Sequence, residues 1–293
     1  MDIRVLKYFL TVAKEQSISR AAEVLHISQP PLSRQLQDLE TELGKKLFLR
    51  GSRKITLTEE GRILRRHAEE IIELTEKAKA EITAFENDLT GEIHIAAGET
   101  KHFRILAKTA AQLQKKHPKI TVNLFSGNYR DIIDKIDGGL VDFGVMIGVS
   151  DIDKYDYLRL PEKDRWGLLI AKSHPLSEKA YISPEDISIL PLIISRQSLE
   201  NREFIHWLKK DGEHLHVIGT YNLLYNATLL AEEGDGGVLC LEGIIPQYDD
   251  SKLRFVPLSP TFETSVVLVW KKQKEHSRAA QHFLELLLQN ISS

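Results

Sequence analysis

Three helical patterns and two short strands open the chain. Apolar residues recur every three or four positions in the first two segments, and a third such segment follows a short turn. Asp2 is placed to cap the first helix and Ser28 the third, whose prolines fall in the first turn, where a missing N–H costs little. The pattern predicts helices over Asp2–Lys14, over Ile18–Leu25 and between Ser28 and Gly44, then strands over Leu47–Arg50 and Ile55–Thr58.

The third predicted helix has an apolar and a polar face. Leucines spaced by four, three and four residues predict one buried stripe, formed by Leu32, Leu36, Leu39 and Leu43. The opposite face carries Pro30, Arg34, Gln37 and Thr41, with Gln29 and Ser33 on its flank. A helix that is buried on one side and presents Arg, Gln and Ser near its N-terminus can enter a major groove and hydrogen-bond to base edges. The two strands around Gly51-Ser52-Arg53-Lys54 would form a basic wing.

A long amphipathic helix is predicted next. Thr58, Glu59 and Glu60 suit its start because acidic side chains favour the first turn. It runs for about thirty residues, or about 45 Å. Its apolar stripe repeats at intervals of four and three: Leu64, Ala68, Ile71, Thr75, Ala78, Ile82, Phe85 and Leu89. A narrow heptad stripe favours a partner helix, so we expect dimerisation here; the alternative is a helix that lies on its own domain.

Beyond Gly91 the pattern changes to alternating strands and helices. The predicted strands are Glu92–Ala97, Ile120–Ser126, Leu140–Ile147, Trp166–Ala171, Leu192–Ser195, Leu215–Thr220, Gly237–Leu241 and Thr264–Lys271. The predicted helices are Phe103–His117, Asp131–Ile136, Glu200–Lys210, Leu223–Glu233 and His276–Gln289. Such alternation indicates an α/β domain with a parallel sheet, which binds ligands at the carboxyl ends of its strands.

Composition and charge narrow the class of protein. The 293 residues suffice for two domains, and 42% hydrophobic with 28% charged residues is ordinary for a soluble globular protein. There is no signal-peptide pattern and no apolar run of membrane-spanning length, and a single cysteine, Cys240, cannot form an intramolecular disulfide. We therefore expect a cytoplasmic protein without membrane contact.

The net charge of −3 hides an asymmetry. Residues 1–66 hold thirteen basic and eight acidic side chains, which leaves a net charge of −8 on the remainder. The ten residues from Lys45 to Lys54 contain five basic and no acidic side chains. A basic head on an acidic body suggests that the head binds a polyanion.

Several of these segments resemble one protein family. The dense matches are FLTVA from Phe9, SISRAA from Ser17, ISQPPLSRQL from Ile27 and LTEEG from Leu57. Looser matches follow at GEIHI from Gly91, HP from His117, GGLVD from Gly138, HPL from His174 and GDGGV from Gly234. In these residues the chain resembles the LysR-type transcriptional regulators.

The resemblance implies an α/β protein with three parts. These are a winged helix-turn-helix over residues 1–58, a linker dimerisation helix over 59–89, and an effector-binding domain over 90–293 that is similar to the type 2 periplasmic-binding fold. Subdomain I would cover about 90–161 and 263–293, and subdomain II about 162–262, with chain crossings near Pro161 and Phe262. Such regulators bind double-stranded DNA as homodimers or homotetramers, need no cofactor, and respond to a small effector between the subdomains.

The family pattern assigns DNA contacts on the third helix and the wing. The residues are Arg20, Gln29, Pro30, Ser33, Arg34, Gln37, Arg50, Arg53 and Lys54. Arg34 could bond guanine through both of its terminal nitrogens, whereas wing cations would add salt-dependent affinity for phosphates. The alternatives are a solvated surface arginine at Arg34 and a structural ion pair at Arg20. The expected dimerisation residues are Leu64, Ala68, Ile71, Ala78, Ile82, Phe85 and Leu89.

The family's effector contacts map to turns after strands. The residues are Thr100, Lys101, Gly127, Asn128, Ile147, Gly148, Ser195, Arg196, Gln197 and Asn222. Thr100 is the leading candidate. Lys101 and Arg196 favour an anionic effector, since helix N-termini near these turns also suit a carboxylate, whereas Glu99 argues the other way.

Other functions are less well supported by the residues. An enzyme lacks the G-x-S-x-G, P-loop and H-E-x-x-H motifs, and Asp142-Phe143-Gly144 has no kinase partners. A redox sensor would have to use Cys240, which lies alone in an apolar strand, and a metal sensor would need His206, His214 and His216, whose spacing matches no common ligand set. A solute-binding protein would leave residues 1–89 unused, and a generic basic head would bind DNA without selecting a sequence.

Overall fold

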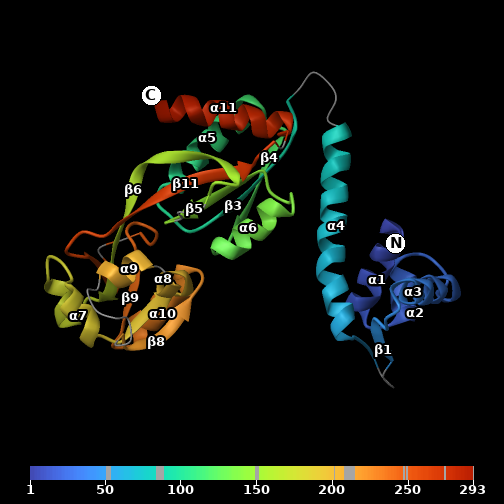
Figure 1. Ribbon diagram of the computed structural model, residues 1–293, viewed down its shortest axis with the longest axis horizontal. Coiled ribbons are helices and arrows are strands. Elements are labelled where there is room, and N and C mark those ends of the chain that lie inside the picture. The colour runs from blue at the N-terminus through green and yellow to red at the C-terminus, as the bar shows by residue number, and fades with distance from the viewer. Residues whose placement is uncertain are drawn as a thin grey trace. The chain divides into compact units, whose positions relative to one another are not determined.

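The chain divides into two compact units, Met1–Phe85 and Glu86–Ser293 (Figure 1). The computed structural model describes residues 1–50, 54–83, 89–148, 152–200, 202–207, 215–246, 248, 250–273 and 275–292. We refer to the first unit as the head and to the second as the body.

The head contains the predicted helices and the hairpin. Its elements are α1 (Ile3–Glu15), α2 (Ile18–Val24), α3 (Gln29–Leu43), β1 (Phe48–Arg50), β2 (Ile55–Leu57) and α4 (Glu59–Thr83). The Asp2 side chain caps α1 by accepting a hydrogen bond from the Arg4 N–H, and Gly44 ends α3 in the left-handed region at φ 64°. The core of the head gathers apolar side chains from all four helices, with Leu6, Phe9, Leu32 and Leu39 among the most buried.

Two details of α3 differ from the sequence prediction. Ser28 occupies the N-cap position, but its side chain makes no capping hydrogen bond. The N–H groups that such a cap would bond belong to the second and third helical residues, and here these are Pro30 and Pro31, which have none. The leucine stripe also stops at Leu39, because Leu43 in the last turn is 41% exposed.

A half-buried carboxylate, that of Glu40, connects the wing to α3. Glu40 accepts hydrogen bonds from the backbone N–H of Leu47 at 2.8 Å and of Phe48 at 3.3 Å, and from Lys46 Nζ at 2.7 Å. Burial acts to raise the pKa of Glu40, but the bonds from Lys46 and the two N–H groups outweigh it, so its pKa lies below the ordinary value. The carboxylate therefore fixes where β1 starts relative to α3.

Helix α4 begins against the same strand. The Thr58 hydroxyl donates to the Lys46 carbonyl at 2.8 Å and accepts from the Gly61 N–H at 2.9 Å, which caps the helix. A Cβ at Gly61 would lie 2.2 Å from the Leu47 carbonyl oxygen, so only glycine permits this close approach.

Several residues of the apolar stripe of α4 pack against other parts of this chain. Leu64 and Ile71 are half-buried against the head core, and Ala68 is fully buried in it, because α1 packs along this face of α4. In this half, α4 lies on its own domain, as in the alternative considered from the sequence. Which residues of α4 contact a partner helix stays a prediction. Leu89 is also buried, in the core of the body. Ala78 is exposed, the backbone of Ile82 lies in α4, and the Ile82 side chain and Phe85 fall outside the described residues.

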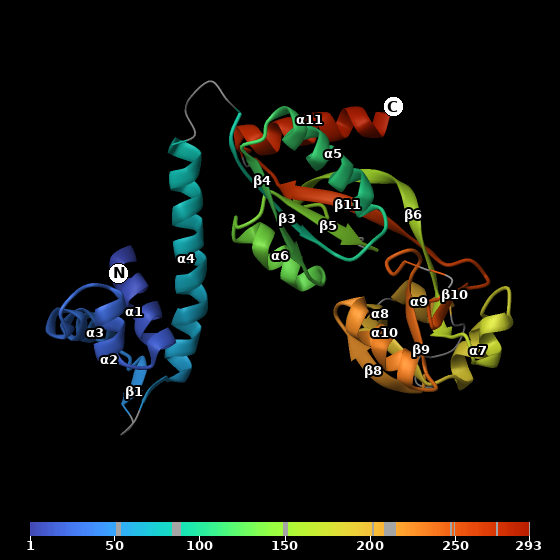
Figure 2. The same ribbon diagram turned by 180° about the vertical axis from the view of Figure 1, so that it is seen from behind.

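The body is built around one sheet path that crosses two subdomains (Figures 1 and 2). Its described strands are β3 (Gly91–Ala97), β4 (Ile120–Ser126), β5 (Phe143–Ile147), β6 (Tyr155–Ala171), β7 (Leu192–Ser195), β8 (Val217–Tyr221), β9 (Gly237–Leu241), β10 (Leu253–Pro257) and β11 (Glu263–Lys271). The order is β4-β3-β5-β11-β6-β9-β7-β8, with β10 paired to β6. Parallel pairing joins β3 to β4 and β5, and β7 to β8 and β9.

Helices cover the two halves of this sheet. They are α5 (Phe103–Lys116), α6 (Tyr129–Asp137) and α11 (Arg278–Ser292) in the first half, and the short 3₁₀ helix η1 (Pro175–Glu178) with α7 (Pro184–Ile189), α8 (Arg196–Glu200), α9 (Arg202–Trp207) and α10 (Leu224–Glu233) in the second. Separate apolar cores lie in the two halves, one centred on Phe143 and Phe283, the other on Leu192 and Phe204. None of the described helices combines the length and the apolar character that a membrane crossing requires.

Strands β6 and β11 are the links between the halves. β11 pairs with the first part of β6 antiparallel, from Glu263 opposite Arg165 to Lys271 opposite Tyr155, and beyond Val266 it also pairs with β5. The later part of β6 pairs with β9 and β10. Sequence reasoning placed only Trp166–Ala171 in this strand, because its earlier residues are mostly charged and include Pro161.

Three other elements of the body were not expected from the sequence. These are η1, α7 and β10. Of the predicted helix over Glu200–Lys210, residues 202–207 form α9, and residues 201 and 208–210 lie outside the described residues. The start of α7 did carry a readable signal. Ser183 and Asp186 form a capping box around Pro184, a sequence typical of a helix N-terminus.

Replacement of Glu40 tests its role in anchoring the wing. We expect Glu40→Ala to lower the free energy of opening of the head by about 1–3 kcal/mol, because two backbone N–H groups lose their acceptor. Native-state hydrogen exchange of α3 and β1 amides in the full chain measures this. Because the pKa of Glu40 is lowered in the fold, its contribution is complete above the ordinary carboxyl pKa and is lost as the pH falls through the lower folded value.

Glu42→Ala is the matched control. Glu42 lies on the same helix and its carboxylate, which is 54% exposed, pairs with the N-terminal ammonium at 2.7 Å. Exposed pairs contribute about 0–1 kcal/mol, so this variant should change little. Equal effects of the two substitutions would contradict the anchoring role.

Candidate functional site

The polar face of α3 is presented to solvent at its N-terminal end. Gln29, Pro30, Arg34 and Gln37 are exposed and Ser33 is half-buried. The opposite face, formed by Leu32, Leu36 and Leu39, is buried in the head core. The helix is therefore held by one side and free on the other, which is the geometry that insertion into a groove requires.

The neighbouring α2 contributes one basic side chain that is partly engaged. Arg20 Nη2 donates to the Glu15 carbonyl oxygen at 2.9 Å, so it bonds a backbone carbonyl rather than forming the ion pair considered from the sequence. Ser19 donates to Gln29 Oε1 at 3.1 Å, which orients the first side chain of α3.

The wing is described in part. Lys54 is exposed beside β2, and the backbone of Arg50 ends β1. The Arg50 side chain and all of Arg53 lie outside the described residues. Lys45 and Lys46 are paired within the head, with Glu60 at 3.7 Å and Glu40 at 2.7 Å, so Lys46 has a structural role.

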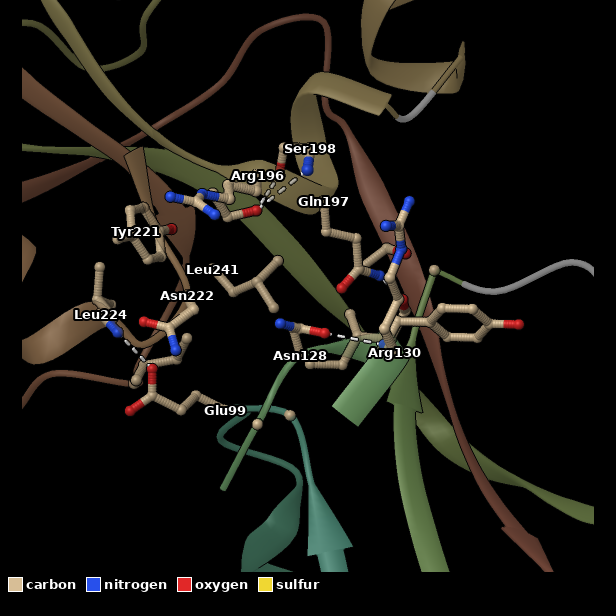
Figure 3. A pocket seen from close by; sticks show the side chains of 18 of the residues that line it. Glu99, Asn128, Arg130, Arg196, Gln197, Ser198, Tyr221, Asn222, Leu224 and Leu241 are labelled. Carbon is tan, nitrogen blue, oxygen red and sulfur yellow. Dashed lines mark hydrogen bonds between the residues drawn. The ribbon is translucent and has the colours of Figure 1, made fainter. Parts of the chain in front are cut away.

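In the body, a cleft lies between the two subdomains at the carboxyl ends of the parallel strands (Figure 3). Its cavity measures about 290 Å³ and is bordered by the ends of β3, β4, β5, β7 and β8. The lining residues are Gly98, Glu99, Gly127, Asn128, Tyr129, Arg130, Ile147, Gly148, Trp166, Ser195, Arg196, Gln197, Ser198, Tyr221, Asn222, Leu224, Leu241, Ile244 and Thr264. The position agrees with the rule that open α/β sheets bind ligands outside the carboxyl ends of their strands.

Most of the expected effector residues lie in this cleft. The lining includes Gly127, Asn128, Ile147, Gly148, Ser195, Arg196, Gln197 and Asn222. Many of their polar atoms already have partners: Asn128 accepts from the N–H groups of Arg130 and Asp131 and caps α6, and Ser195 Oγ lies 2.7 Å from Ser198 Oγ.

Thr100 and Lys101 are the exceptions, and neither lines the cavity. The Thr100 hydroxyl donates to Asp164 Oδ2 at 2.6 Å in a buried site, and Lys101 Nζ pairs with Glu242 Oε2 at 2.9 Å. The turn after β3 thus directs Thr100 inward to β6, and it is Glu99 that faces the cleft. An effector contact at Thr100 stays a prediction.

Asp164 is the centre of a polar cluster at the junction of the subdomains. Its other oxygen, Oδ1, lies 3.2 Å from His102 Nε2, and its side chain is fully buried. Burial raises the pKa of the Asp164 carboxyl, against the lowering effect of the Thr100 bond and the His102 charge. The cluster joins the start of α5 to the crossing strand β6.

Several lining residues were missed by sequence reasoning. Trp166 and Thr264 lie on the crossing strands, Leu241 ends β9 and Leu224 starts α10, so their convergence depends on long-range pairing. Arg130 lies in the first turn of α6 close to the expected Asn128, and Ser198 follows Gln197 in α8; these two could have been found by extending each predicted turn into its helix. Tyr129 belongs to the turn 127–129 that the family pattern indicates, and it lines the cavity.

The groups considered for redox or metal sensing do not form a site in the described parts of the chain. Cys240 is 1% exposed in β9, and burial raises the pKa of its thiol far above the ordinary range, so it behaves as a structural residue. Over the described residues there is no cluster of three or more His, Cys, Asp and Glu side chains that could hold a metal ion. His206 and His216 are exposed, and His214 lies outside the described residues.

Both units match family models. Residues 3–62 match the model described as bacterial regulatory helix-turn-helix protein, lysR family, and residues 86–292 match the LysR substrate binding domain. Among curated relatives, the HTH-type transcriptional regulator BsdA of Bacillus subtilis (strain 168) is 29% identical over 300 residues, which cover 98% of this chain and 100% of the relative. The regulator CysL of the same organism is 32% identical over 209 residues, covering 71% of this chain and 70% of the relative.

Solved structures show the same fold over the whole chain. CbnR, a LysR family transcriptional regulator, matches with a TM-score of 0.78 at 22% identity and covers 100% of both chains. CbnR in complex with its target DNA matches with a TM-score of 0.77 at 20% identity over 99% of this chain and 100% of that chain. With a lysR-family helix-turn-helix in its head and a LysR substrate-binding domain in its body, this chain belongs to the LysR family of transcriptional regulators.

Proposed function

We propose that this regulator binds an imperfect inverted repeat in promoter DNA as a homodimer or homotetramer, and that a small molecule in the cleft controls it. The exposed polar face of α3 is the observation that carries the proposal. It offers Gln29, Arg34 and Gln37 on a helix whose other side is locked into the head core. The regulator acts by binding alone, without catalysis or a cofactor, in the cytoplasm.

The cleft supports the second half of the proposal. A ligand between the subdomains would contact β5 and α6 on one side and α8 and α10 on the other. Ligand binding would then shift the populations of the conformations of the body that differ in the cleft. The change in the body would in turn alter how the heads of the oligomer bind DNA. The relative CbnR was solved with its target DNA, which supports the same role for this head.

Binding-site selection from genomic fragments with the full chain tests the DNA-binding proposal. We expect a two-fold-symmetric motif with half-sites one helical turn, about 34–36 Å, or a multiple of it, apart. Binding that is diffuse, salt-sensitive and without a motif would contradict the proposal and favour a generic polyanion patch.

Arg34 is expected to read bases. Arg34→Ala should weaken binding to the selected motif by about 1–3 kcal/mol and relax base preference at one position in each half-site. Selection repeated with the variant measures this. An equal loss of affinity on every sequence would instead assign Arg34 to a phosphate.

Lys54 provides the contrasting case on the wing. Lys54→Ala should weaken binding to all sequences alike and reduce the slope of log K against log salt by about 0.9, because one phosphate contact is lost. Affinity measured over a series of salt concentrations decides this. A sequence-dependent loss with an unchanged slope would contradict a phosphate contact.

For dimerisation through α4, we propose the exposed face rather than the stripe used by the head core. Ile63 is 51% and Leu74 44% exposed, and their spacing of eleven residues places them on one side of the helix. Leu74→Asp should lower the association state of the full chain in sedimentation velocity, since a charge in an apolar helix pair is destabilising. Val24→Asp, at a residue 57% exposed on α2, is the control. An unchanged association state in the Leu74 variant would exclude this face.

A further inference from the structure

The cleft has an acidic end that lacks a cationic partner. Glu99 is half-buried, and its Oε2 accepts a hydrogen bond from the backbone N–H of Leu224 at 2.5 Å. Within the described parts of the chain, no Lys, Arg or His side chain forms an ion pair with it; its neighbour Lys101 pairs with Glu242 instead. A partly buried carboxylate without a cation is costly, so a positively charged ligand group would be stabilised here.

Glu99 also changes what the start of α10 can bind. A helix N-terminus would ordinarily suit a ligand carboxylate, but the first N–H of α10 already bonds Glu99 across the cleft. A ligand carboxylate at this point would be repelled by the negative charge of Glu99. The anionic part of a ligand must therefore bind elsewhere in the cavity.

The other end of the cavity provides donors. Figure 3 shows Arg196 on the opposite side of the cleft from Glu99. The Arg196 side chain is exposed, its Nε makes one long bond to Thr220 Oγ1 at 3.4 Å, and no described carboxylate pairs with it.

Apolar and polar side chains share the rest of the lining. Ile147, Leu241 and Ile244 contribute apolar wall, Asn128, Tyr221 and Asn222 contribute polar groups, and the cavity of about 290 Å³ is at the small end of the range for ligand sites. The cleft thus combines the Glu99 carboxylate on one side, the Arg196 guanidinium on the other and apolar surface in its wall.

From this arrangement we propose that the effector is a small zwitterion with an apolar body, such as an amino acid, and not a simple anion. Its ammonium group pairs with Glu99, and its carboxylate accepts hydrogen bonds from Arg196. The inference rests on the proposed function, since it assumes that the effector binds in this cleft.

Matched sets of probes test the class of ligand. Each set contains an amino acid, the carboxylate without the amine, and the amine without the carboxylate: leucine, 4-methylpentanoate and 3-methylbutylamine; phenylalanine, 3-phenylpropanoate and 2-phenylethylamine; 6-aminohexanoate, hexanoate and hexylamine. Calorimetric titration of the full chain should show saturable binding of a zwitterion and binding of its two counterparts weaker by about tenfold or more, the loss expected when a desolvated charge has no partner.

Glu99→Gln separates recognition from helix capping. The amide oxygen can still accept the Leu224 N–H, so the fold keeps this contact while the charge is removed. We expect affinity for the zwitterion to fall by about tenfold or more and affinity for the carboxylate counterpart to stay the same or rise. Glu242→Gln is the matched control: it removes a nearby carboxylate that does not line the cavity, and should leave zwitterion affinity within about threefold.

The outcomes distinguish this inference from the proposed function. A carboxylate that binds as tightly as its amino acid, a Glu99→Gln variant that binds like the Glu242 control, or no zwitterion binding at all would overturn the inference. Binding of a simple anion in the cleft would leave the proposed effector control intact. If the same protein fails to select a DNA motif, the proposed function is contradicted, but the class of ligand that the cleft binds is not affected.

Discussion

The antiparallel pairing of β6 with β11 is the constraint on which the body depends. Strand β6 pairs with β11 in the first half of the sheet and with β9 and β10 in the second, so each half can form its own core while the chain passes between them. The cleft is the space left where the halves meet, and the crossing strands supply part of its floor through Trp166 and Thr264. The buried Asp164 on β6 bonds Thr100 from the first half, which fixes the loop after β3 against the crossing point. The direction of Glu99 into the cleft follows from that bond.

In the head, one glutamate has a comparable role. Glu40 lies on α3 but bonds the backbone at the start of the wing, so the helix and the hairpin are positioned by the same side chain. Thr58 bonds the Lys46 carbonyl, and Gly61 lies close to the Leu47 carbonyl, so the start of α4 is held next to the start of the wing. Because α4 buries Ala68 and half-buries Leu64 and Ile71 in the head, its first half is part of the DNA-binding unit as well as a linker. A rotation of α4 would consequently move α1 with it.

The chemistry of the cleft separates this chain from a simple anion receptor. The turn after β3 presents the Glu99 carboxylate to the cleft, whereas the Thr100 hydroxyl of the same turn bonds Asp164. Glu99 also accepts a hydrogen bond from the first N–H of α10. Two hydrogen bonds between described residues connect the subdomains at the lining of the cleft: Glu99 with the Leu224 N–H, and Gln197 with the Ile147 carbonyl. A ligand must therefore replace or complement these polar groups.

The sequence by itself determined the elements and the order of the fold. Periodicity located the head helices, the hairpin and most of the sheet, because each has a local signal: leucines at helical spacing in α3, Gly44 at its end, and apolar runs of strand length such as Val238–Leu241. The residue pattern also identified the family, which the matches to both units confirm. Most of the turn residues expected around the cleft line it, since strand ends and helix starts are local features.

Two features of the sequence are ambiguous until the tertiary structure is known: the apolar stripe of α4 and the turn formed by residues 99–101. The heptad stripe of α4 is compatible with a partner helix or with its own head, and in the tertiary structure α1 packs along α4 and Ala68 is buried in the head core. In Glu99-Thr100-Lys101 any of the three side chains could face the cleft, and the choice depends on Asp164, a residue 64 positions away. Trp166, Leu241 and Thr264 join the site for the same reason. Contacts between residues distant in sequence depend on sheet pairing, and no local pattern encodes them.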